Sequence, residues 1–362
     1  MKAARYYGPG DVRIEEIAEP QPKHGQVKIK VTSSLVCGSD LHAYLAPMPK
    51  FPTKTEAVAL SGEKLPITLG HEISGTIVEL GPGLDTQQWK VGQNVVIEPL
   101  VSCLKTDTCR ECAAGTTNIC PEANCIGIGG WGGGLSEYIA TDIRCVHQLP
   151  DGVPLDVGAC MEPLAVAWYA VKRSGFKKGD TALISGAGPI GLFLLIVLRS
   201  IDSLSNIFIT EPTSRRRELA HAHGVTTALD PTGLSGEAVA VEVQKTNGGF
   251  GVDFVFDAAG VQISLDAGLA SLRPRGVFVN VAGWEKSPKI DMNLILIREI
   301  ILTGTVCYNG IHPEMLAAVS SGKINGISNL ITKKISLEDL VQEGLLTLLH
   351  NKDSHVKILV HP

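Results

Sequence analysis

Residues 181–199 read TALISGAGPIGLFLLIVLR and contain the pattern that decides the fold of the second half of the chain. The apolar run 181–185 has the length and composition of a buried strand, and residues 192–199 those of an apolar helix. Between them, Gly186, Gly188 and Gly191 follow the spacing Gly-x-Gly-x-x-Gly. Strand, glycine turn and helix in this order predict one unit of a doubly wound α/β domain.

The same alternation continues after this stretch. Strand-like segments at 206–210, 252–257 and 276–281 alternate with helix-like segments at 214–223 and 263–272, which predicts a buried parallel sheet. Before residue 160, short β-rich pieces (27–31, 73–80 and 94–97) stand among Gly, Pro and Cys clusters, as in an irregular β-rich domain. After residue 305 come helix-like segments at 313–319 and 337–349 and a closing strand at 356–360. We therefore expect a domain at 1–160, completed by the tail at about 307–362, and an α/β domain at 161–306.

Length and composition narrow the function classes. A chain of 362 residues suits two domains, and 44% hydrophobic with 19% charged residues indicates an ordered globular protein. The net charge of -5 offers no general attraction for nucleic acid or anionic lipid. The apolar run 192–198 is far shorter than the ~18 residues that span a bilayer, and the N-terminus lacks the apolar core of a signal peptide. We expect a cytoplasmic protein whose nine cysteines are thiols or metal ligands rather than disulfides.

The glycine turn also predicts a ligand. Glycines let the backbone approach a pyrophosphate at the helix N-terminus, beside Pro189 and Ile190. Glu211 ends the next predicted strand, at the place for a carboxylate that holds ribose hydroxyls and repels a 2′-phosphate. Glu211 therefore favours NAD, although the run 215–217, three arginines, could accept the phosphate of NADP or simply form a solvated helix face.

A first metal constellation lies in the N-terminal half. Residues 37–42 read CGSDLH and residues 70–72 read GHE. Cys37, His71 and the later Glu162 would supply three borderline ligands with a fourth position open, the pattern of a catalytic zinc. Taken separately, Cys37 could be a buried thiol and His71 a hydrogen-bonded core histidine.

A second constellation consists of cysteines only. Cys109 and Cys112 have zinc-finger-like spacing, and Cys120 follows after seven residues. With Cys103 they would form the four-thiolate set of a closed structural zinc. Cys103 is loosely spaced, so Cys125 could replace it, and all of them could be ordinary loop cysteines. The remaining three, Cys145, Cys160 and Cys307, are interpreted as buried thiols.

Together these residues resemble the zinc-containing medium-chain alcohol and polyol dehydrogenases over nearly the whole chain. The resemblance implies a GroES-like catalytic domain and a Rossmann domain, with Cys37 and His71 on the catalytic zinc and Glu162 in the position of the third ligand. Near the zinc, it further implies that Asp40 accepts the other ring N–H of the zinc histidine, that Ser39 and His42 relay the substrate proton, and that Glu72 lies behind the metal or ligates it. At the nucleotide, it implies that Arg216 joins Glu211 at the ribose and that the segments around Val281 and Val306 approach the nicotinamide.

Within the family, the long segment 46–66, the CGSDLH phrase and Cys307-Tyr308 look most like the 2,3-butanediol dehydrogenases of fungi and bacteria. We therefore expect hydride transfer between NAD and a secondary alcohol or vicinal diol such as (R,R)-2,3-butanediol, by a homodimer or homotetramer. Sorbitol or xylitol dehydrogenases are the second choice, because they usually carry an arginine where this chain has Cys307; threonine dehydrogenase is a third. A protein that binds nucleotide without catalysis is a different class, and the complete set of site residues argues against it.

Overall fold

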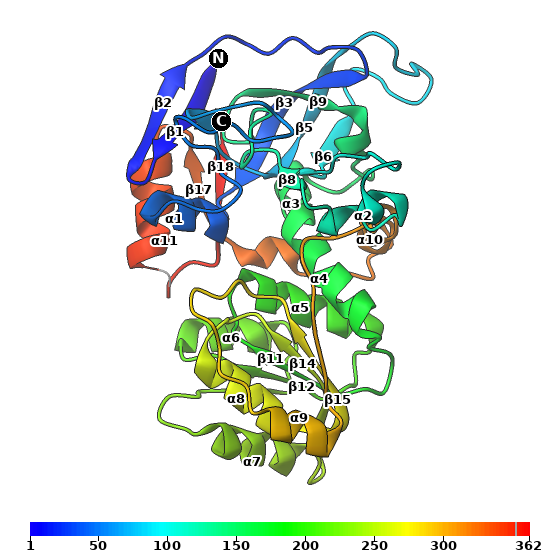
Figure 1. Cartoon of the computed structure of the whole chain (residues 1–362), viewed down its shortest axis with the longest axis vertical. Coiled ribbons are helices and arrows are strands. Elements are labelled where there is room, and N and C mark those ends of the chain that lie inside the picture. Colours follow the sequence, from blue (N-terminus) through cyan, green and yellow to red (C-terminus); the bar gives the residue numbers. More distant parts are fainter. Residues whose placement is uncertain (352) are drawn as a thin grey trace. The chain divides into compact units, whose positions relative to one another are not determined.

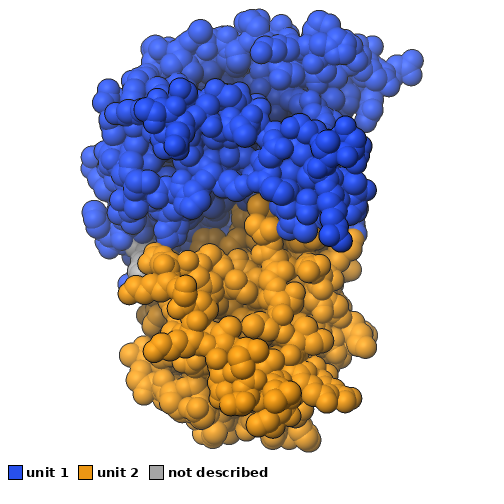
Figure 2. Space-filling model, in the orientation of Figure 1, with its two compact units in different colours: residues 1–162, 312–322, 327–362 blue, residues 163–311, 323–326 orange. Residues whose placement is uncertain are grey.

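The computed structural model describes residues 1–351 and 353–362 and divides them into two compact units (Figure 2). Unit 1 comprises Met1–Glu162, His312–Gly322 and Ile327–Pro362, and unit 2 comprises Pro163–Ile311 and Lys323–Gly326. None of the helices in these described ranges is long and apolar enough to cross a membrane. The predicted fold class is confirmed, since one unit is β-rich and the other contains a parallel sheet with helices.

Unit 1 is built on a seven-stranded sheet with the order β10-β6-β5-β3-β18-β17, in which β9 also pairs with β3. A three-stranded sheet, β2-β1-β4, and the short pair β7-β8 complete its strands. Their bounds are β1 Lys2–Gly8, β2 Asp11–Glu16, β3 Gln26–Leu35, β4 Ile67–Thr68, β5 Glu72–Leu80, β6 Asn94–Ile97, β7 Leu100–Val101, β8 Asn124–Cys125, β9 Tyr138–Asp142, β10 Val146–Gln148, β17 Ile331–Ser336 and β18 Lys357–His361. The helices are α1 Gly38–Leu45, α2 Arg110–Ala113, α3 Leu155–Ala159, α10 His312–Ser320 and α11 Thr347–His350, and α4 Met161–Ser174 begins here.

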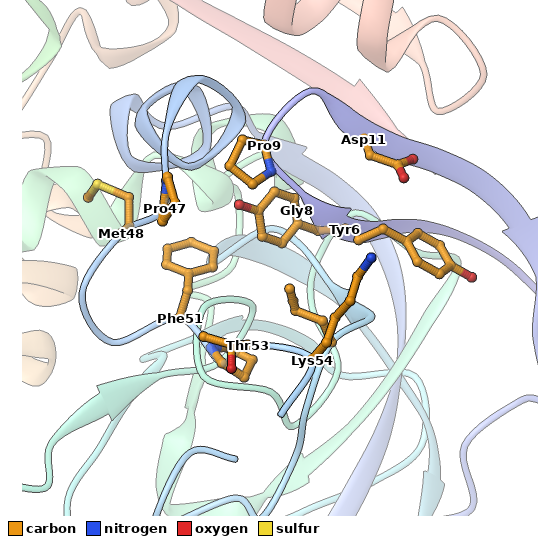
Figure 3. Close-up of a pocket in the computed structure, with 12 residues that line it drawn as sticks. Tyr6, Gly8, Pro9, Asp11, Pro47, Met48, Phe51, Thr53 and Lys54 are labelled. Carbon is orange, nitrogen blue, oxygen red and sulfur yellow. The ribbon is translucent and has the colours of Figure 1, made fainter. Parts of the chain in front are cut away.

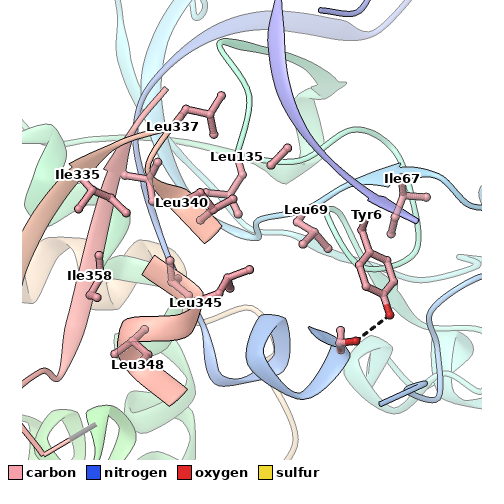
Figure 4. Packing of buried hydrophobic residues seen from close by; sticks show 14 residues of the cluster. Tyr6, Ile67, Leu69, Leu135, Ile335, Leu337, Leu340, Leu345, Leu348 and Ile358 are labelled. Carbon is pink, nitrogen blue, oxygen red and sulfur yellow. Dashed lines mark hydrogen bonds between the residues drawn. The ribbon is translucent and has the colours of Figure 1, made fainter. Parts of the chain in front are cut away.

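The end of the chain is part of this unit. The strand β18, red in Figure 1, pairs antiparallel with β3, where Leu359 faces Leu35, and parallel with β17. Behind these strands a cluster of fully buried side chains includes Leu69, Leu340 and Ile358 (Figure 4). The hydroxyl of Tyr6 in this cluster donates a 2.8 Å hydrogen bond to the carbonyl of Ala43. This bond fixes α1, the helix that follows Cys37, against the core.

Unit 2 contains a parallel sheet with the order β13-β12-β11-β14-β15-β16. Counted along the chain, this is the strand order 3-2-1-4-5-6 of a Rossmann domain. The strands are β11 Ala182–Ser185, β12 Ile207–Thr210, β13 Thr227–Leu229, β14 Val252–Asp257, β15 Leu272–Asn280 and β16 Ile301–Gly304. The helices are α5 Pro189–Ile201, α6 Ser214–Ala222, α7 Gly236–Thr246, α8 Gln262–Ser271 and α9 Met292–Arg298.

The expected elements of both units are found, with differences at their ends. Helix α5 starts three residues before the predicted apolar run, because Pro189 fits the first helical position, where no N–H is needed. The tail helix predicted at 337–349 is a π-helical segment, Leu340–Leu346, that continues into α11. Sequence reasoning did not identify β13, α7 or α9, whose patterns are short or broken by polar residues.

Candidate active site and metal centres

The first site is organised by the start of α1. The backbone N–H of Cys37, the residue before the helix, donates a 2.9 Å hydrogen bond to Oδ2 of the buried Asp40. A carboxylate in the first turn satisfies an N–H that the helix leaves unpaired. Ser39 lies in the same turn, with its Oγ 3.3 Å from Nε2 of His71, and His42 is exposed in the last turn. The CGSDLH phrase therefore places a thiol and a hydroxyl on one helix end.

His71 and Glu72 reach this helix end from the start of β5. The preceding Gly70 has a φ of +96°, and a Cβ there would lie 2.7 Å from the backbone nitrogen of Leu135, so only glycine fits. Single ligand atoms of Cys37, His71 and Glu72 lie within 4.8 Å of one another. Nδ1 of His71 and Oδ1 of Asp40 are both buried and have no hydrogen-bond partner in the described part of the chain. The expected bond between Asp40 and His71 is thus not formed, and Asp40 caps α1 through its other oxygen.

The charges favour a thiolate at Cys37. Burial alone would raise the pKa of this thiol, but the positive charges of His71 and Lys357 bring it down to about 6. Burial alone would lower the pKa of His71, but Cys37 raises it well above the usual range. Because thiolate, imidazole and carboxylate are the donors that zinc prefers, and because they converge here, the residues fit a zinc ion.

A lysine that the sequence analysis did not identify holds Glu72. Lys357, at the start of β18, is 2% exposed, and its Nζ lies 2.6 Å from Oε2 of Glu72 and also contacts Oε1. Burial alone would lower the pKa of Lys357, but the carboxylate of Glu72 and the sulfur of Cys37 raise it, so the lysine stays charged. A lysine 285 residues away along the chain gives no local signal. Only the pairing of β18 with β3 brings it to the site.

Glu162 occupies the first turn of α4 and is buried. Its negative charge contributes to the raised pKa of His71. Its carboxylate is not among the ligand atoms that lie within 4.8 Å of one another, where Glu72 stands instead. Glu72 is thus the carboxylate grouped with the Cys37–His71 pair, and Glu162 acts on His71 through its charge.

The four-cysteine cluster comes together without Cys125. The sulfur of Cys103 lies 3.6 Å from that of Cys112 and 3.5 Å from that of Cys120, and Cys109 lies 3.8 Å from Cys120. A tetrahedral zinc with Zn–S bonds near 2.3 Å separates its sulfurs by about 3.8 Å. Burial alone would raise the pKa of Cys120, but hydrogen bonds, first that of the Cys103 backbone, lower it to about 7. The observed spacing therefore fits a structural zinc, with the loosely spaced Cys103 as one ligand.

In unit 2 the glycine turn is fixed by a carboxylate. Both oxygens of the buried Glu211 are bound, Oε2 by the backbone N–H of Ala187 at 2.8 Å and Oε1 by that of Thr213 at 3.0 Å. Gly188 caps α5 in an extended conformation, and the Nη1 of Arg216 lies 4.0 Å from where a Cβ of residue 188 would be. The turn, Pro189, Ile190, Glu211 and Arg216 thus surround one helix N-terminus.

The other predicted nucleotide residues have distinct surroundings. Arg215 pairs with Glu218 on the surface, while Arg217 donates to the carbonyl of Glu211 and pairs with Asp230. Arg215 and Arg217 therefore make these contacts away from the glycines, and Arg216 is the arginine beside the turn. Val281 follows β15, where its N–H donates to the carbonyl of Asp257, and Val306 follows β16, half exposed. Both lie past the carboxyl ends of parallel strands, where ligands of such sheets bind.

Comparison with known proteins decides the family. Residues 23–151 match the alcohol dehydrogenase GroES-like domain, and residues 189–321 match the zinc-binding dehydrogenase family. An (R,R)-butanediol dehydrogenase of Neisseria gonorrhoeae is 40% identical, with 100% of this chain and 99% of the relative covered. This chain belongs to the zinc-binding alcohol dehydrogenase family.

Other relatives agree. The (R,R)-butanediol dehydrogenase of Bacillus subtilis is 38% identical, with both chains covered completely. A crystal structure of 2R,3R-butanediol dehydrogenase from Bacillus subtilis superimposes with a TM-score of 0.91 at 37% identity, covering 100% of this chain and 99% of that one. The chain is thus an enzyme, an oxidoreductase, and the predicted cofactors, zinc and NAD, are those of this dehydrogenase family.

This dehydrogenase also has a cavity of about 410 Å³ in unit 1 (Figure 3). It is lined by Tyr6, Met48, Phe51 and Lys54 among others, and the rings of Tyr6 and Phe51 meet edge to face with centroids 5.6 Å apart. None of the predicted metal ligands lines it. The long segment 46–66 therefore forms a wall of a separate surface cavity.

Proposed function

We propose that the enzyme oxidises a small secondary alcohol with NAD, reversibly, and that the substrate is a vicinal diol such as (R,R)-2,3-butanediol, with acetoin as product. The observation that carries the chemistry is the convergence of the Cys37 thiolate, His71 and the buried carboxylate of Glu72, with the charge of Glu162 acting on His71. The identity of 40% over the whole chain to an (R,R)-butanediol dehydrogenase supports the substrate. Cys307, in place of the arginine expected of polyol dehydrogenases, also favours a diol over a sugar alcohol.

In this proposal Cys37, His71 and Glu162 hold the catalytic zinc. Glu72 is the less suitable third ligand, because Lys357 already contacts both of its oxygens. A zinc ion bound here would act as a Lewis acid that lowers the pKa of an alcohol and favours loss of hydride to NAD. Glu72 and Lys357 then form a charged pair that compensates the charge around the ligands.

The chain itself moves the proton. Ser39, whose hydroxyl faces the ring nitrogen of His71, is placed to accept a proton from the substrate hydroxyl. His42 is exposed on the same helix and is placed to pass the proton on to water. Asp40 is a positioning residue that fixes the start of α1, and thereby Cys37 and Ser39, through its bond to the Cys37 N–H.

We assign the nucleotide to unit 2, and the catalytic chemistry to the domain of residues 1–160 with its C-terminal return. The pyrophosphate would lie on Gly186, Gly188, Pro189, Ile190 and Gly191, with Glu211 and Arg216 at the ribose and the segments of Val281 and Val306 toward the nicotinamide. Glu211 favours NAD over NADP, since a 2′-phosphate would meet its negative charge. The cytoplasm is the proposed compartment, because no disulfide joins any of the nine cysteines, all of which lie in described parts of the chain.

The test is NADH absorbance on (R,R)-, meso- and (S,S)-2,3-butanediol, sorbitol, xylitol and threonine, with zinc quantified on the same protein. Preference for one butanediol isomer supports the proposal, and activity on sorbitol alone would overturn the substrate. Glu162→Ala should lose one zinc per chain and its activity, and Cys125→Ser, a matched change outside both clusters, should lose neither. Normal zinc content and turnover in Glu162→Ala would instead assign the third ligand to Glu72.

A homodimer or homotetramer with unit 2 at an interface is the proposed assembly. Strand β16 ends the sheet, and its Ile301 and Leu302 are 56% and 42% exposed; on α9, Leu296 and Ile297 are 74% and 79% exposed. An apolar sheet edge of this kind invites pairing with a second copy. Light scattering should show a dimer or tetramer for the wild type and a smaller species for Ile301→Lys. A monomeric wild type would contradict the assignment.

A further inference from the structure

Unit 1 contains a third cluster of metal-binding side chains, which shares no residue with the two zinc constellations. It consists of Glu98, His147 and His312. Glu98 follows β6, and His147 is the middle residue of β10, which pairs antiparallel with β6. His312 begins α10 and is the first residue of the segment that returns from unit 2 to unit 1. Three segments far apart in the sequence thus meet at one point.

The side chains converge on a single oxygen. Oε2 of Glu98 lies 2.7 Å from Nε2 of His147 and 3.0 Å from Nδ1 of His312. The two imidazole rings are stacked, with centroids 4.6 Å apart and an interplanar angle of 6°. The side chain of His312 is fully buried, while those of His147 and Glu98 are 21% and 18% exposed. The cluster is therefore a mostly buried pocket of donors with one side open to solvent.

We propose that Glu98, His147 and His312 form a third metal site, which takes a divalent transition-metal cation such as Zn²⁺. Two imidazoles and one carboxylate are a ligand set that zinc accepts, with a fourth position for water. Tetrahedral ligands at the usual zinc distances of about 2.0–2.1 Å are separated by about 3.3 Å. The two oxygen–nitrogen separations of 2.7 and 3.0 Å are shorter than this, and the stacked rings hold their nitrogen lone pairs in nearly parallel planes, so one imidazole must rotate out of the stack before both nitrogens can bind one ion. The exposed side of His147 and Glu98 provides its entry path.

A metal at this place has a structural consequence. It would join the β6–β10 strand pair to the start of α10, where the chain re-enters unit 1. Because an ion that binds only the folded state stabilises it by mass action, the melting temperature should rise with the free zinc concentration after the other two sites are filled. Without a metal, the carboxylate simply accepts hydrogen bonds from both histidines, and added zinc would have no such effect.

The test uses the full enzyme, purified with zinc and dialysed against buffered micromolar Zn²⁺, with metal counted by mass spectrometry. We expect three zinc ions per chain in the wild type and two in His147→Gln and in Glu98→Gln. Glu98→Gln is the second variant because it keeps the size and an acceptor oxygen, so it should fold even if the first does not. His221→Gln, which changes an exposed histidine on α6, is the matched control and should keep three.

The folded state of each variant is checked by circular dichroism and NADH binding, neither of which needs the third metal. Loss of one zinc and of the zinc-dependent rise in melting temperature in both variants supports the site. Equal zinc content in wild type and folded variants would overturn it, whatever the total. Absence of zinc from the two cysteine-containing constellations would instead contradict the proposed function, so the two failures are distinguishable.

Discussion

Two glycines at the start of α5, Gly188 at its N-cap and Gly191 in its first turn, separate nucleotide binding from folding. Gly188 has φ −68° and ψ −177°, which alanine also adopts, and a Cβ there would meet only Nη1 of Arg216 at 4.0 Å. At Gly191, a Cβ would lie 1.9 Å from the carbonyl oxygen of Gly186, a distance at which backbone must move. The folded chain therefore has space for a methyl group at residue 188, but at residue 191 its own backbone occupies that space.

The expected effects on stability therefore differ. Replacing glycine by alanine at a compatible conformation stabilises by about 0.4–1 kcal/mol, because the unfolded chain loses freedom. Gly188 is the N-cap of α5, where alanine is less favourable than glycine by a similar amount, so the two effects offset and Gly188→Ala should melt close to the wild type. Overpacking costs about 1–3 kcal/mol or more, so Gly191→Ala should lower the melting temperature by roughly 2–12 °C. If the pyrophosphate approaches the backbone at Gly188, the added methyl group should weaken NADH binding about tenfold or more, which corresponds to about 1.4 kcal/mol.

The assay is NADH titration by fluorescence together with thermal unfolding without nucleotide. Gly188→Ala should be as stable as wild type and bind poorly. Wild-type affinity in Gly188→Ala would refute the placement of the pyrophosphate on this turn. Destabilisation equal to that of Gly191→Ala would refute the reasoning about space.

Three further perturbations test other parts of the molecule. Lys357→Met leaves the carboxylate of Glu72 buried and unpaired, which costs about 3–5 kcal/mol and should lower the denaturation midpoint in urea, whereas Lys357→Arg should keep most of the stability. Cys103→Ser should remove one zinc per chain by elemental analysis; full zinc content there, or equal loss in Cys125→Ser, would contradict its place in the cluster. Burial alone would raise the pKa of Asp253, but hydrogen bonds from Arg273 and Thr181 lower it. Ionised Asp253 therefore stabilises the fold above its unfolded pKa of about 3.9, and this stability is lost as the pH falls toward the folded pKa. The difference in unfolding free energy between wild type and Asp253→Asn should be larger at about pH 7 than at about pH 4, and a constant difference would contradict this.

What the sequence predicted well is local. A few consecutive residues are enough to predict the turn between β11 and α5, the strand β14 and the helix α5. Their patterns of glycine and apolar residues involve only neighbours along the chain. The thiol spacings likewise bring Cys109 and Cys112 together within one helical turn. The sequence could not place Cys103, because its approach to Cys120 depends on the path of a loop.

What it missed depends on pairing between distant segments. Lys357 appears as an ordinary charged residue in a closing strand, and nothing near it in the sequence indicates a buried partner. Likewise, the Glu98–His147–His312 cluster exists because β6 pairs with β10 and α10 returns to the same unit. Each of these residues, taken alone, is more often an ordinary polar residue than a ligand.

The choice between Glu72 and Glu162 shows how one distant residue changes the interpretation of a motif. In the sequence, the resemblance names Glu162 as the third ligand and leaves Glu72, next to His71, either behind the metal or as an alternative ligand. In the structure Glu72 is bound on both oxygens by a charged, buried lysine, whereas Glu162 acts on His71 from the first turn of α4. Releasing Glu72 for a metal would leave Lys357 charged without its partner in a buried site, a cost that Glu162 does not incur. The lysine therefore argues for Glu162 as the third ligand, although the ligand atoms of Glu72 stand nearer to those of Cys37 and His71.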